Sequence, residues 1–372
     1  MTVATPSITT HQESDGTIEQ ISRWRGLLIG TAIGDALGLP AEGLSRRRVQ
    51  RLYQGNWRHR LVFGRGMISD DTEHTAFVAQ SLLRYPDSPE RFARRLGWYL
   101  RGWLLSLPAG IGFATLRAIL KLWLGFPPNH SGVYSAGNGP AMRVAAIGAF
   151  FAHHPQRRAA YVAVSTRITH TDPKALTGAT AIAELAAWIV RDRLTRRPSL
   201  ATFIALLRRC GPDDAEWQTL VDAIEQAARE NRTVAELAEK MGLAQGVTGY
   251  IYHTVPIAVY AWFQHDGDYR PTLTAVLNCG GDTDTVGAIA GALAGATVGE
   301  SGIPEEWKAG VTDWPCSLTW LRALADRLAT VTRTGQPSAP LRYFWPAIPV
   351  RNLVFLLIVL AHGFRRLLPP YR

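Results

Sequence analysis

A repeated glycine spacing decides the fold of this chain: residues 26–38 read GLLIGTAIGDALG, with a glycine at every fourth position. The same spacing returns in residues 287–299, which read GAIAGALAGATVG. A glycine inside a helix costs about 1 kcal/mol relative to alanine, so two such stripes need a structural reason. Membrane helix pairs use a similar pattern, but Asp35 interrupts the first stripe and the second apolar run is short. We therefore expect two buried helices of a soluble core whose backbones approach closely along the glycines.

The rest of the chain is helical in pattern nearly throughout. A capping box at residues 233–236 opens one helix. No stretch of alternating apolar and polar residues is long enough to indicate a sheet. The sequence therefore predicts a predominantly α fold. Helical spacing of apolar residues is found over residues 21–39, 72–83, 91–105, 141–151, 174–190 and 201–210.

Length and composition allow one large domain or two ordinary ones. The chain has 372 residues, of which 47% are apolar and 19% charged, enough to fill a sizeable core. Its three scattered cysteines are too few for a disulfide framework or a zinc site, which favours a reducing, cytoplasmic setting. The polar start predicts no signal peptide. We expect a disordered tail over residues 1–16, a main domain over 17–332, and a linker with an apolar helical extension over 333–372.

The net charge of +10 indicates a surface that attracts anions. Arginines cluster at residues 46–48 and 365–366, but no nucleic-acid-binding motif accompanies them. The apolar run over residues 353–361 is shorter than the ~20 residues of a membrane-spanning helix, so no stable membrane insertion is expected. A buried or docking helix is the first interpretation of this run. A helix lying on an anionic membrane surface or on a partner protein is the alternative.

Two acidic clusters are the strongest chemical signal. The first is Ser69-Asp70-Asp71-Thr72-Glu73, and the second is Gly280-Gly281-Asp282-Thr283-Asp284-Thr285. Each precedes a helical run, so each could simply cap a helix. Capping uses one acceptor, however, whereas each cluster offers two aspartates and hydroxyls. Brought together, these oxygens would form a site for hard divalent cations such as Mg²⁺ or Mn²⁺; kept apart, they would be ordinary caps.

Three further elements could contribute to a site. Asp35 lies in an apolar helix, so it is either buried with partners or facing a polar cavity, and Glu42 follows the helix-ending Pro40 on a loop. The loop over residues 135–139 suits a phosphate or ribose, although it also fits an ordinary turn. His170 precedes a helix and either contacts a ligand or is structural. We find no defensible Ser-His-Asp order, no Walker A loop, and no strand before the glycine-rich segments as a dinucleotide-binding unit requires.

Taken in order, these motifs resemble the ADP-ribosylglycohydrolase family, which includes the dinitrogenase reductase-activating glycohydrolase. The resemblance covers roughly residues 20 to 330. It implies a compact, orthogonal multi-helix bundle with a dinuclear Mg²⁺ or Mn²⁺ centre in a cleft. The motifs that carry it are Gly34-Asp35-Ala36-Leu37-Gly38 with Glu42, residues 69–73, Gly137-Asn138-Gly139 with Ala141-Met142-Arg143, Thr169-His170, and residues 280–285.

The resemblance also implies residue roles. Glu42 would sit on a mobile flap, and Glu42, Asp71 and Asp284 would be catalytic. Substrate contacts would come from Asp35, Gly112, Ser135, Gly137, Asn138, Gly139 and His170. The metal ligands would be Ser69, Asp70, Asp71, Asp282, Asp284 and Thr285.

The chain departs from the family pattern at two places. Ser69 stands where many members carry threonine, although either hydroxyl can act as a ligand. Residues 108–115 contain no carboxylate where many bacterial members have an aspartate. We therefore expect no general base from that loop, and arginine-linked substrates are less favoured.

The resemblance implies a hydrolase that cleaves the bond at C1″ of ADP-ribose attached to a protein, a nucleic acid or a small molecule. Two alternatives stay open: a non-catalytic ADP-ribose-binding or structural protein on the same fold, and a hydrolase of another small metabolite. The intact acidic clusters favour an enzyme.

Overall fold

The computed structural model describes residues 8–368, and within this part the chain is helical, with isolated β-bridges but no strand. This confirms the predicted all-α fold. Four short 3₁₀ turns connect helices: η1 (Leu39–Ala41), η2 (Ala141–Arg143), η3 (Glu300–Gly302) and η4 (Trp345–Ala347). The α-helices are α1 (Ile8–Gly38), α2 (Arg46–Tyr53), α3 (Asp70–Arg84), α4 (Pro89–Leu105), α5 (Phe113–Trp123), α6 (Pro128–Ser131), α7 (Ala145–Phe150), α8 (Pro155–Arg167), α9 (Pro173–Arg191), α10 (Leu200–Cys210), α11 (Ala215–Arg229), α12 (Val234–Lys240), α13 (Ile251–Gln264), α14 (Tyr269–Leu277), α15 (Thr283–Val298), α16 (Glu305–Gly310), α17 (Leu318–Thr334) and α18 (Ile348–Arg365).

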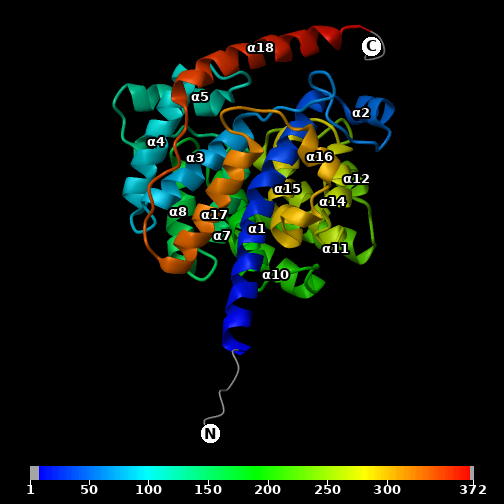
Figure 1. The fold of residues 1–372 in the computed structure, drawn as a ribbon. Helices are drawn as coiled ribbons and strands as arrows, with labels where there is room; N and C mark the ends of the chain where they lie inside the picture. The colour runs from blue at the N-terminus through cyan, green and yellow to red at the C-terminus, as the bar shows by residue number, and fades with distance from the viewer. Residues whose placement is uncertain (1–7, 369–372) are drawn as a thin grey trace.

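The N-terminal segment differs in part from the expected tail. Residues 1–7 lie outside the described part, but α1 already begins at Ile8. This helix runs through the middle of the molecule and projects beyond it at its N-terminal end (Figure 1). Starting a helix is costly, but extending one adds a hydrogen bond for each residue. The packed part of α1 can therefore continue as a helix into the segment that projects.

Helices α1 and α15 form the centre of the fold, and the two glycine stripes face each other. A methyl group added at Gly30 would lie 2.2 Å from the carbonyl oxygen of Gly291, and one added at Gly34 would lie 2.0 Å from that of Gly287. No side chain fits between backbones this close. The predicted close approach is confirmed. Because α15 begins at Thr283, the contact fixes the position of the second acidic cluster.

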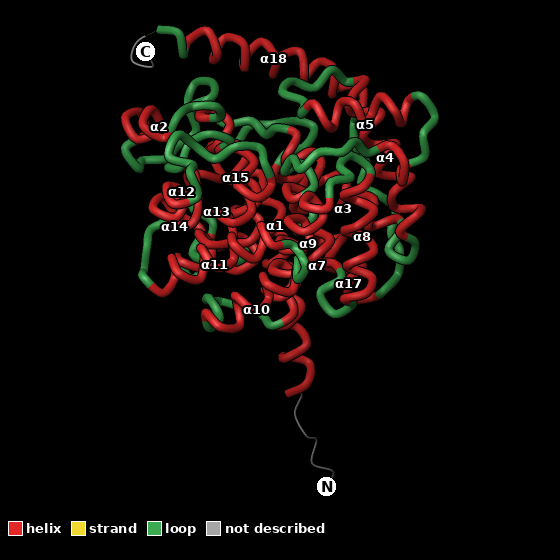
Figure 2. The backbone as a smooth tube through the Cα atoms, turned by 180° about the vertical axis from the view of Figure 1, so that it is seen from behind, coloured by secondary structure: helices red, strands yellow, loops and turns green. Residues whose placement is uncertain are grey.

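The C-terminal helix α18 lies across one end of the molecule, opposite the end from which α1 projects (Figures 1 and 2). Its first turn is anchored by Arg351, whose Nη2 lies 2.6 Å from Oδ2 of Asp313, with both side chains buried. The same guanidinium donates to the Ile68 carbonyl oxygen at 2.6 Å. Because a buried charge needs its partner, this ion pair holds the start of α18 against the residues that precede α3.

The last turn of α18 contacts the loop that carries Glu42. Arg366 donates from Nη1 to the Glu42 carbonyl oxygen at 2.6 Å and from Nη2 to the Pro40 carbonyl oxygen at 2.7 Å. The His362 ring lies 3.0 Å from the same Pro40 oxygen. By length and composition alone, the segment Trp345–Arg365 could cross a membrane. One such helix in a chain is weak evidence of a membrane span. In the structure this helix is a partly exposed strap bound at both ends.

Candidate active site

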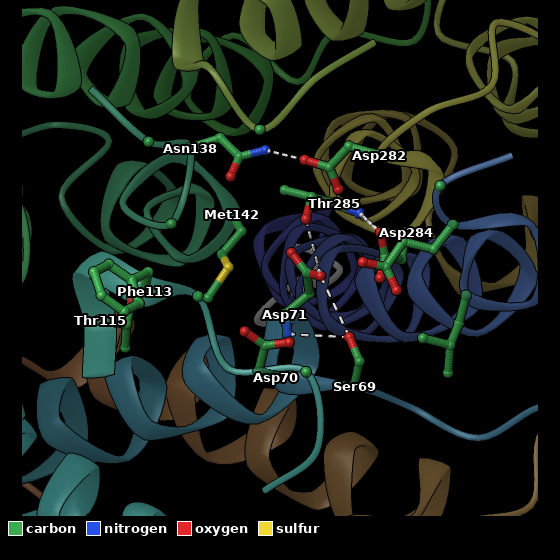
Figure 3. Close-up of a pocket in the computed structure, with 18 of the residues that line it drawn as sticks. Ser69, Asp70, Asp71, Phe113, Thr115, Asn138, Met142, Asp282, Asp284 and Thr285 are labelled. Carbon is green, nitrogen blue, oxygen red and sulfur yellow. Dashed lines mark hydrogen bonds between the residues drawn. The ribbon is translucent and has the colours of Figure 1, made fainter. Parts of the chain in front are cut away.

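The two acidic clusters meet at one cleft of about 600 Å³ (Figure 3). The hydroxyl of Thr285 donates to Oδ2 of Asp71 at 3.3 Å, a contact between positions more than two hundred residues apart. Asp70 and Asp284 line the same cleft. The predicted long-range meeting is therefore confirmed, while the roles of these residues as metal ligands stay predictions.

The first cluster is presented by the start of α3. Ser69 is the N-cap, as predicted, and its hydroxyl accepts from the Asp71 N–H at 3.4 Å. Asp70 and Asp71 then turn toward the cleft, whereas Glu73 points away from it. Glu73 accepts from the Trp103 indole at 2.7 Å and lies 3.7 Å from Arg351. One helix start thus sends two carboxylates to the cleft and a third to the anchor of α18.

The second cluster is presented by a glycine pair that no other residue could replace easily. Gly280 and Gly281 have positive φ angles of 71° and 82°, a conformation that costs glycine little. A methyl group on Gly281 would lie 1.9 Å from the Val247 carbonyl oxygen. The Gly281 N–H donates to the Leu44 carbonyl oxygen at 2.8 Å, and the Gly281 carbonyl oxygen accepts from the Gly43 N–H at 2.8 Å. The glycine pair therefore ties the loop that carries Glu42 to the start of α15.

The carboxylates are crowded enough to perturb one another. Burial, followed by the charges of Asp70, Asp35 and Asp282, raises the pKa of Asp71 well above its usual range. Burial, followed by the charges of Glu42, Asp282 and Asp71, does the same to the pKa of Asp284. The crowding that raises the pKa of Asp71 and of Asp284 favours bound protons or cations.

Asp35 differs from the expectation that it contacts substrate. It is fully buried and is not among the residues that line the cleft. Its carboxylate accepts from the backbone N–H of Ser69 at 2.9 Å and from that of Thr72 at 3.2 Å. Asp35 therefore holds the turn that begins α3 and acts on the site as a positioning residue. A carboxylate in an apolar helix needs buried donors, and the tertiary fold supplies them from α3.

The other predicted site residues do line the cleft. They are Glu42, Ser69, Asp70, Asp71, Gly112, Ser135, Gly137, Asn138, Gly139, His170, Asp282, Asp284 and Thr285. Asn138 is held in place by its backbone N–H, which donates to the Gly249 carbonyl oxygen at 2.9 Å. Its side-chain amide donates to Oδ2 of Asp282 at 2.6 Å. The loop over residues 135–139 thus orients one acidic residue as well as forming the wall of the cleft.

His170 lies beneath the same loop as a neutral ring. A methyl group on Gly137 would lie 2.8 Å from Nε2 of His170. Nδ1 of His170 lies 2.8 Å from the Thr169 hydroxyl. The buried Arg143 donates to that hydroxyl at 2.7 Å. Burial, followed by the charge of Arg143, lowers the pKa of His170 to about 3. His170 can therefore donate or accept a hydrogen bond at neutral pH but carries no charge.

The shifted pKa of His170 predicts a loss of stability in mild acid. An unfolded histidine binds a proton near pH 6.5, whereas the folded ring stays neutral down to about pH 3. Above about pH 6.5 this histidine therefore does not lower the free energy of unfolding. Below that pH it lowers the free energy of unfolding by up to ~1.4 kcal/mol per pH unit. We expect His170→Gln to lose less stability than the parent between pH 7 and about pH 5 in urea unfolding. His153→Gln, at an exposed histidine, is the control, and equal losses in parent and His170→Gln would contradict the assignment.

Several cleft residues were not predicted from the sequence. Phe113 and Thr115 come from the start of α5, and Val247, Thr248 and Gly249 form a loop facing Asn138. The turn residues just before α13 were a usable signal for that loop. Phe355 and Val359 of α18 also line the cleft, and nothing in the local pattern of an apolar helix could show this. Among the described residues that line the cleft there is no lysine or arginine, so the basic surface does not extend into it.

Comparison with known proteins decides the family. The ADP-ribosylglycohydrolase family model matches residues 16–338. This chain belongs to the ADP-ribosylglycohydrolase family. It is an ADP-ribosylglycohydrolase-type enzyme, and this family is generally metal-dependent. Helix α18 lies outside the matched residues.

Relatives and a solved structure agree with the family assignment. An uncharacterized protein of Archaeoglobus fulgidus is 34% identical over 300 residues, which cover 78% of this chain and 92% of that protein. The ADP-ribosyl-[dinitrogen reductase] glycohydrolase of Rhodospirillum rubrum is 28% identical, over 76% of this chain and 87% of its own length. A solved ADP-ribosylglycohydrolase-related protein complex has a TM-score of 0.61 and 27% identity, covering 85% of this chain and 99% of that chain.

The residues present fit a divalent metal centre. Oδ1 of Asp71 is buried and has no hydrogen-bond partner, which is rare for a carboxylate oxygen unless a ligand completes it. The donors around it are oxygens, the ligands that Mg²⁺ and Mn²⁺ prefer. Between residues 8 and 368, no three histidine, cysteine or acidic side chains form a group that could hold an ion by themselves. The hydroxyls of Ser69 and Thr285 would therefore have to contribute.

Proposed function

We propose that this enzyme hydrolyses the glycosidic bond at C1″ of ADP-ribose attached to a protein, a nucleic acid or a small molecule, with two Mg²⁺ or Mn²⁺ ions at its acidic cleft. The observation that carries the proposal is the meeting of Asp71 and Thr285 in the cleft, with one Asp71 oxygen left unpartnered. The family and its named relatives support the reaction class. The cofactor and the linkage rest on the chemistry of the cleft.

Ser69, Asp70 and Asp71 would hold the cations from one side, and Asp282, Asp284 and Thr285 from the other. Bound cations would offset the repulsion among these carboxylates, orient the terminal ribose hydroxyls and lower the pKa of a water molecule. Asn138 fixes Asp282 by its amide hydrogen bond at 2.6 Å. Asp35 fixes the turn that carries Asp70 and Asp71.

The chain's own residues supply the proton transfer. Water attacks C1″, its proton passes to a carboxylate and from there to the leaving group, and the bond to that group breaks with positive charge developing on the ribose ring. Glu42 is the proposed proton acceptor because it lines the cleft at its flap. Partial removal from water, followed by the charge of Asp282, raises the pKa of Glu42, which brings it closer to the value of an effective base at neutral pH. The anionic side chains of the cleft stabilise the charged ring.

The diphosphate of ADP-ribose would be held by polar backbone and hydroxyl groups. The cleft is lined by the loop over residues 135–139 and by Thr248. Within the described part of the chain, no cationic side chain lines it. Backbone N–H groups of small-residue loops can bind phosphates in this way. The basic surface would then steer the ligand toward the cleft rather than contact it.

The deciding experiment measures release of free ADP-ribose by mass spectrometry. The protein with Mg²⁺ or Mn²⁺ is incubated with ADP-ribose linked to arginine, serine, an acidic side chain, a nucleic-acid base and a small alcohol. We expect release from at least one substrate, abolished by chelation of divalent cations. Tight binding of ADP-ribose without release from any substrate would instead make this chain a binding protein. Release that survives chelation would remove the metal centre from the proposal.

A further inference from the structure

Helix α18 carries an exposed apolar stripe along its outer side, which we call the outer face of α18. Its residues recur at helical spacing, and their exposed fractions lie between 48% and 69%. Figures 1 and 2 show the helix lying along the outside of one end of the molecule. An exposed apolar patch of this extent usually marks an interaction site. The outer face consists of Val350, Leu353, Val354, Leu357, Leu360 and Phe364.

The opposite side of α18 is fixed against the protein, so the outer face cannot turn inward. Phe355 is 3% exposed and packs with Leu39, Leu61 and Met67. Arg351 holds the start of the helix and Arg366 its end. The helix could shed these contacts only by breaking a buried ion pair, which is costly. The outer face is therefore a permanent part of the surface.

The charged residues of the C-terminal segment that carries this face are all basic. No acidic residue follows Asp326 in the sequence. Arg365 is exposed beside Phe364, and Arg47 and Arg48 are exposed on α2, which lies below the same end of α18 in both views (Figures 1 and 2). A second copy of this chain, with net charge +10, would place arginines against arginines. An apolar stripe bordered by arginines matches an anionic lipid surface.

A spanning orientation does not fit the geometry. Arg351 and Arg365 limit the uncharged segment to residues 352–364, about 20 Å of helix at 1.5 Å per residue. The hydrocarbon core of a bilayer is about 30 Å thick. Helices with one apolar face and basic flanks lie in the plane of the membrane instead.

We propose that the outer face of α18 docks this enzyme on an anionic lipid bilayer, with the helix axis in the membrane plane. Val359 and Phe355 line the cleft from the inner side of the same helix, so docking places the cleft next to the lipid surface. The proposal stands apart from the reaction, since membrane binding needs neither metal nor substrate.

The test is co-sedimentation of the full chain with lipid vesicles. We expect binding to vesicles that contain phosphatidylserine to exceed binding to phosphatidylcholine alone by at least about tenfold, and to weaken with salt. Leu357→Glu should lower binding at least about tenfold, because it places a charge in the apolar stripe. Leu357 is 59% exposed, so the variant is expected to keep the parent's thermal unfolding. Ile18 is 64% exposed and belongs to the N-terminal part of α1, the end of that helix that projects opposite α18 (Figure 1), so Ile18→Glu should bind as the parent does.

Any of four results would overturn the proposal. The first two are equal binding to both vesicle types and unchanged binding by Leu357→Glu. The third is resistance of the bound protein to extraction by alkaline carbonate, which would show a spanning helix. The fourth is a solution dimer that Leu357→Glu dissociates, with no vesicle binding by the parent. That result would assign the outer face of α18 to a second copy.

Discussion

Asp284→Ala is expected to lower turnover at least about a thousandfold without unfolding the protein. Loss of a group that merely orients a metal ligand typically costs 10–100-fold, and Asp284 is proposed as a ligand itself. Burial and the neighbouring charges of Glu42, Asp282 and Asp71 raise its pKa, so its ionised form is disfavoured in the metal-free fold. Removing it relieves that repulsion. The free energy of unfolding of metal-free Asp284→Ala should therefore equal or exceed that of the parent.

The measurements are ADP-ribose release and thermal unfolding with and without Mg²⁺ or Mn²⁺. A ligand that binds the folded state raises the unfolding temperature, so the parent should be stabilised by the cation and Asp284→Ala should not. Calorimetry should show a changed metal stoichiometry in the variant. Asp268→Ala is the matched control, because Asp268 caps α14 and is exposed away from the cleft. Full cation stabilisation of Asp284→Ala would refute its assignment as a ligand.

Gly30→Ala is expected to destabilise the protein by at least about 3 kcal/mol, a large effect for one methyl group. The added carbon would lie 2.2 Å from the Gly291 carbonyl oxygen and 3.2 Å from the α-carbon of Gly295. Both are backbone atoms and cannot rotate away, so α1 and α15 must separate. That movement would also strain the hydrogen bond at 2.7 Å from the Tyr269 hydroxyl to the Gly30 carbonyl oxygen. Separation displaces the start of α15 and with it Asp284.

Urea unfolding of Gly30→Ala and of two control variants tests this prediction. Gly363→Ala lies in α18 with no atom within 4 Å of the added carbon, and Gly97→Ala in α4 meets its nearest neighbour at 3.6 Å. Both should leave stability unchanged or raise it by up to about 1 kcal/mol, because alanine is the better helix former. If Gly30→Ala were as stable as Gly97→Ala, the glycine stripes would not be needed for close packing.

Much of the candidate site could be predicted because its residues are locally marked. Two aspartates after an N-cap serine exceed what capping requires, and the second pair of aspartates follows two adjacent glycines, Gly280 and Gly281. In the structure Ser69 caps α3, and the two glycines have positive φ angles. These signals were readable because they depend on spacing within a few residues.

The errors came from side chains whose surroundings are set by distant segments. Asp35 was expected at the substrate, yet its acceptor capacity is used by backbone N–H groups of α3. The net charge of +10 indicated a surface that attracts anions, but it could not show that no lysine or arginine within the described residues lines the cleft. The inward face of α18 could not be predicted, because an apolar helix can bury any side until its anchors are known.

The sequence by itself determined the helical class, the glycine contact between two helices and the residue types at the acidic clusters, because helix periodicity and glycine's missing side chain act locally. Tertiary structure alone decided that Asp71 and Thr285 share a cleft and that Asp35 lies behind it. It also decided that α18 turns Phe355 toward the cleft and Leu357 toward solvent. Such contacts join segments hundreds of residues apart, and their geometry follows from how whole helices pack.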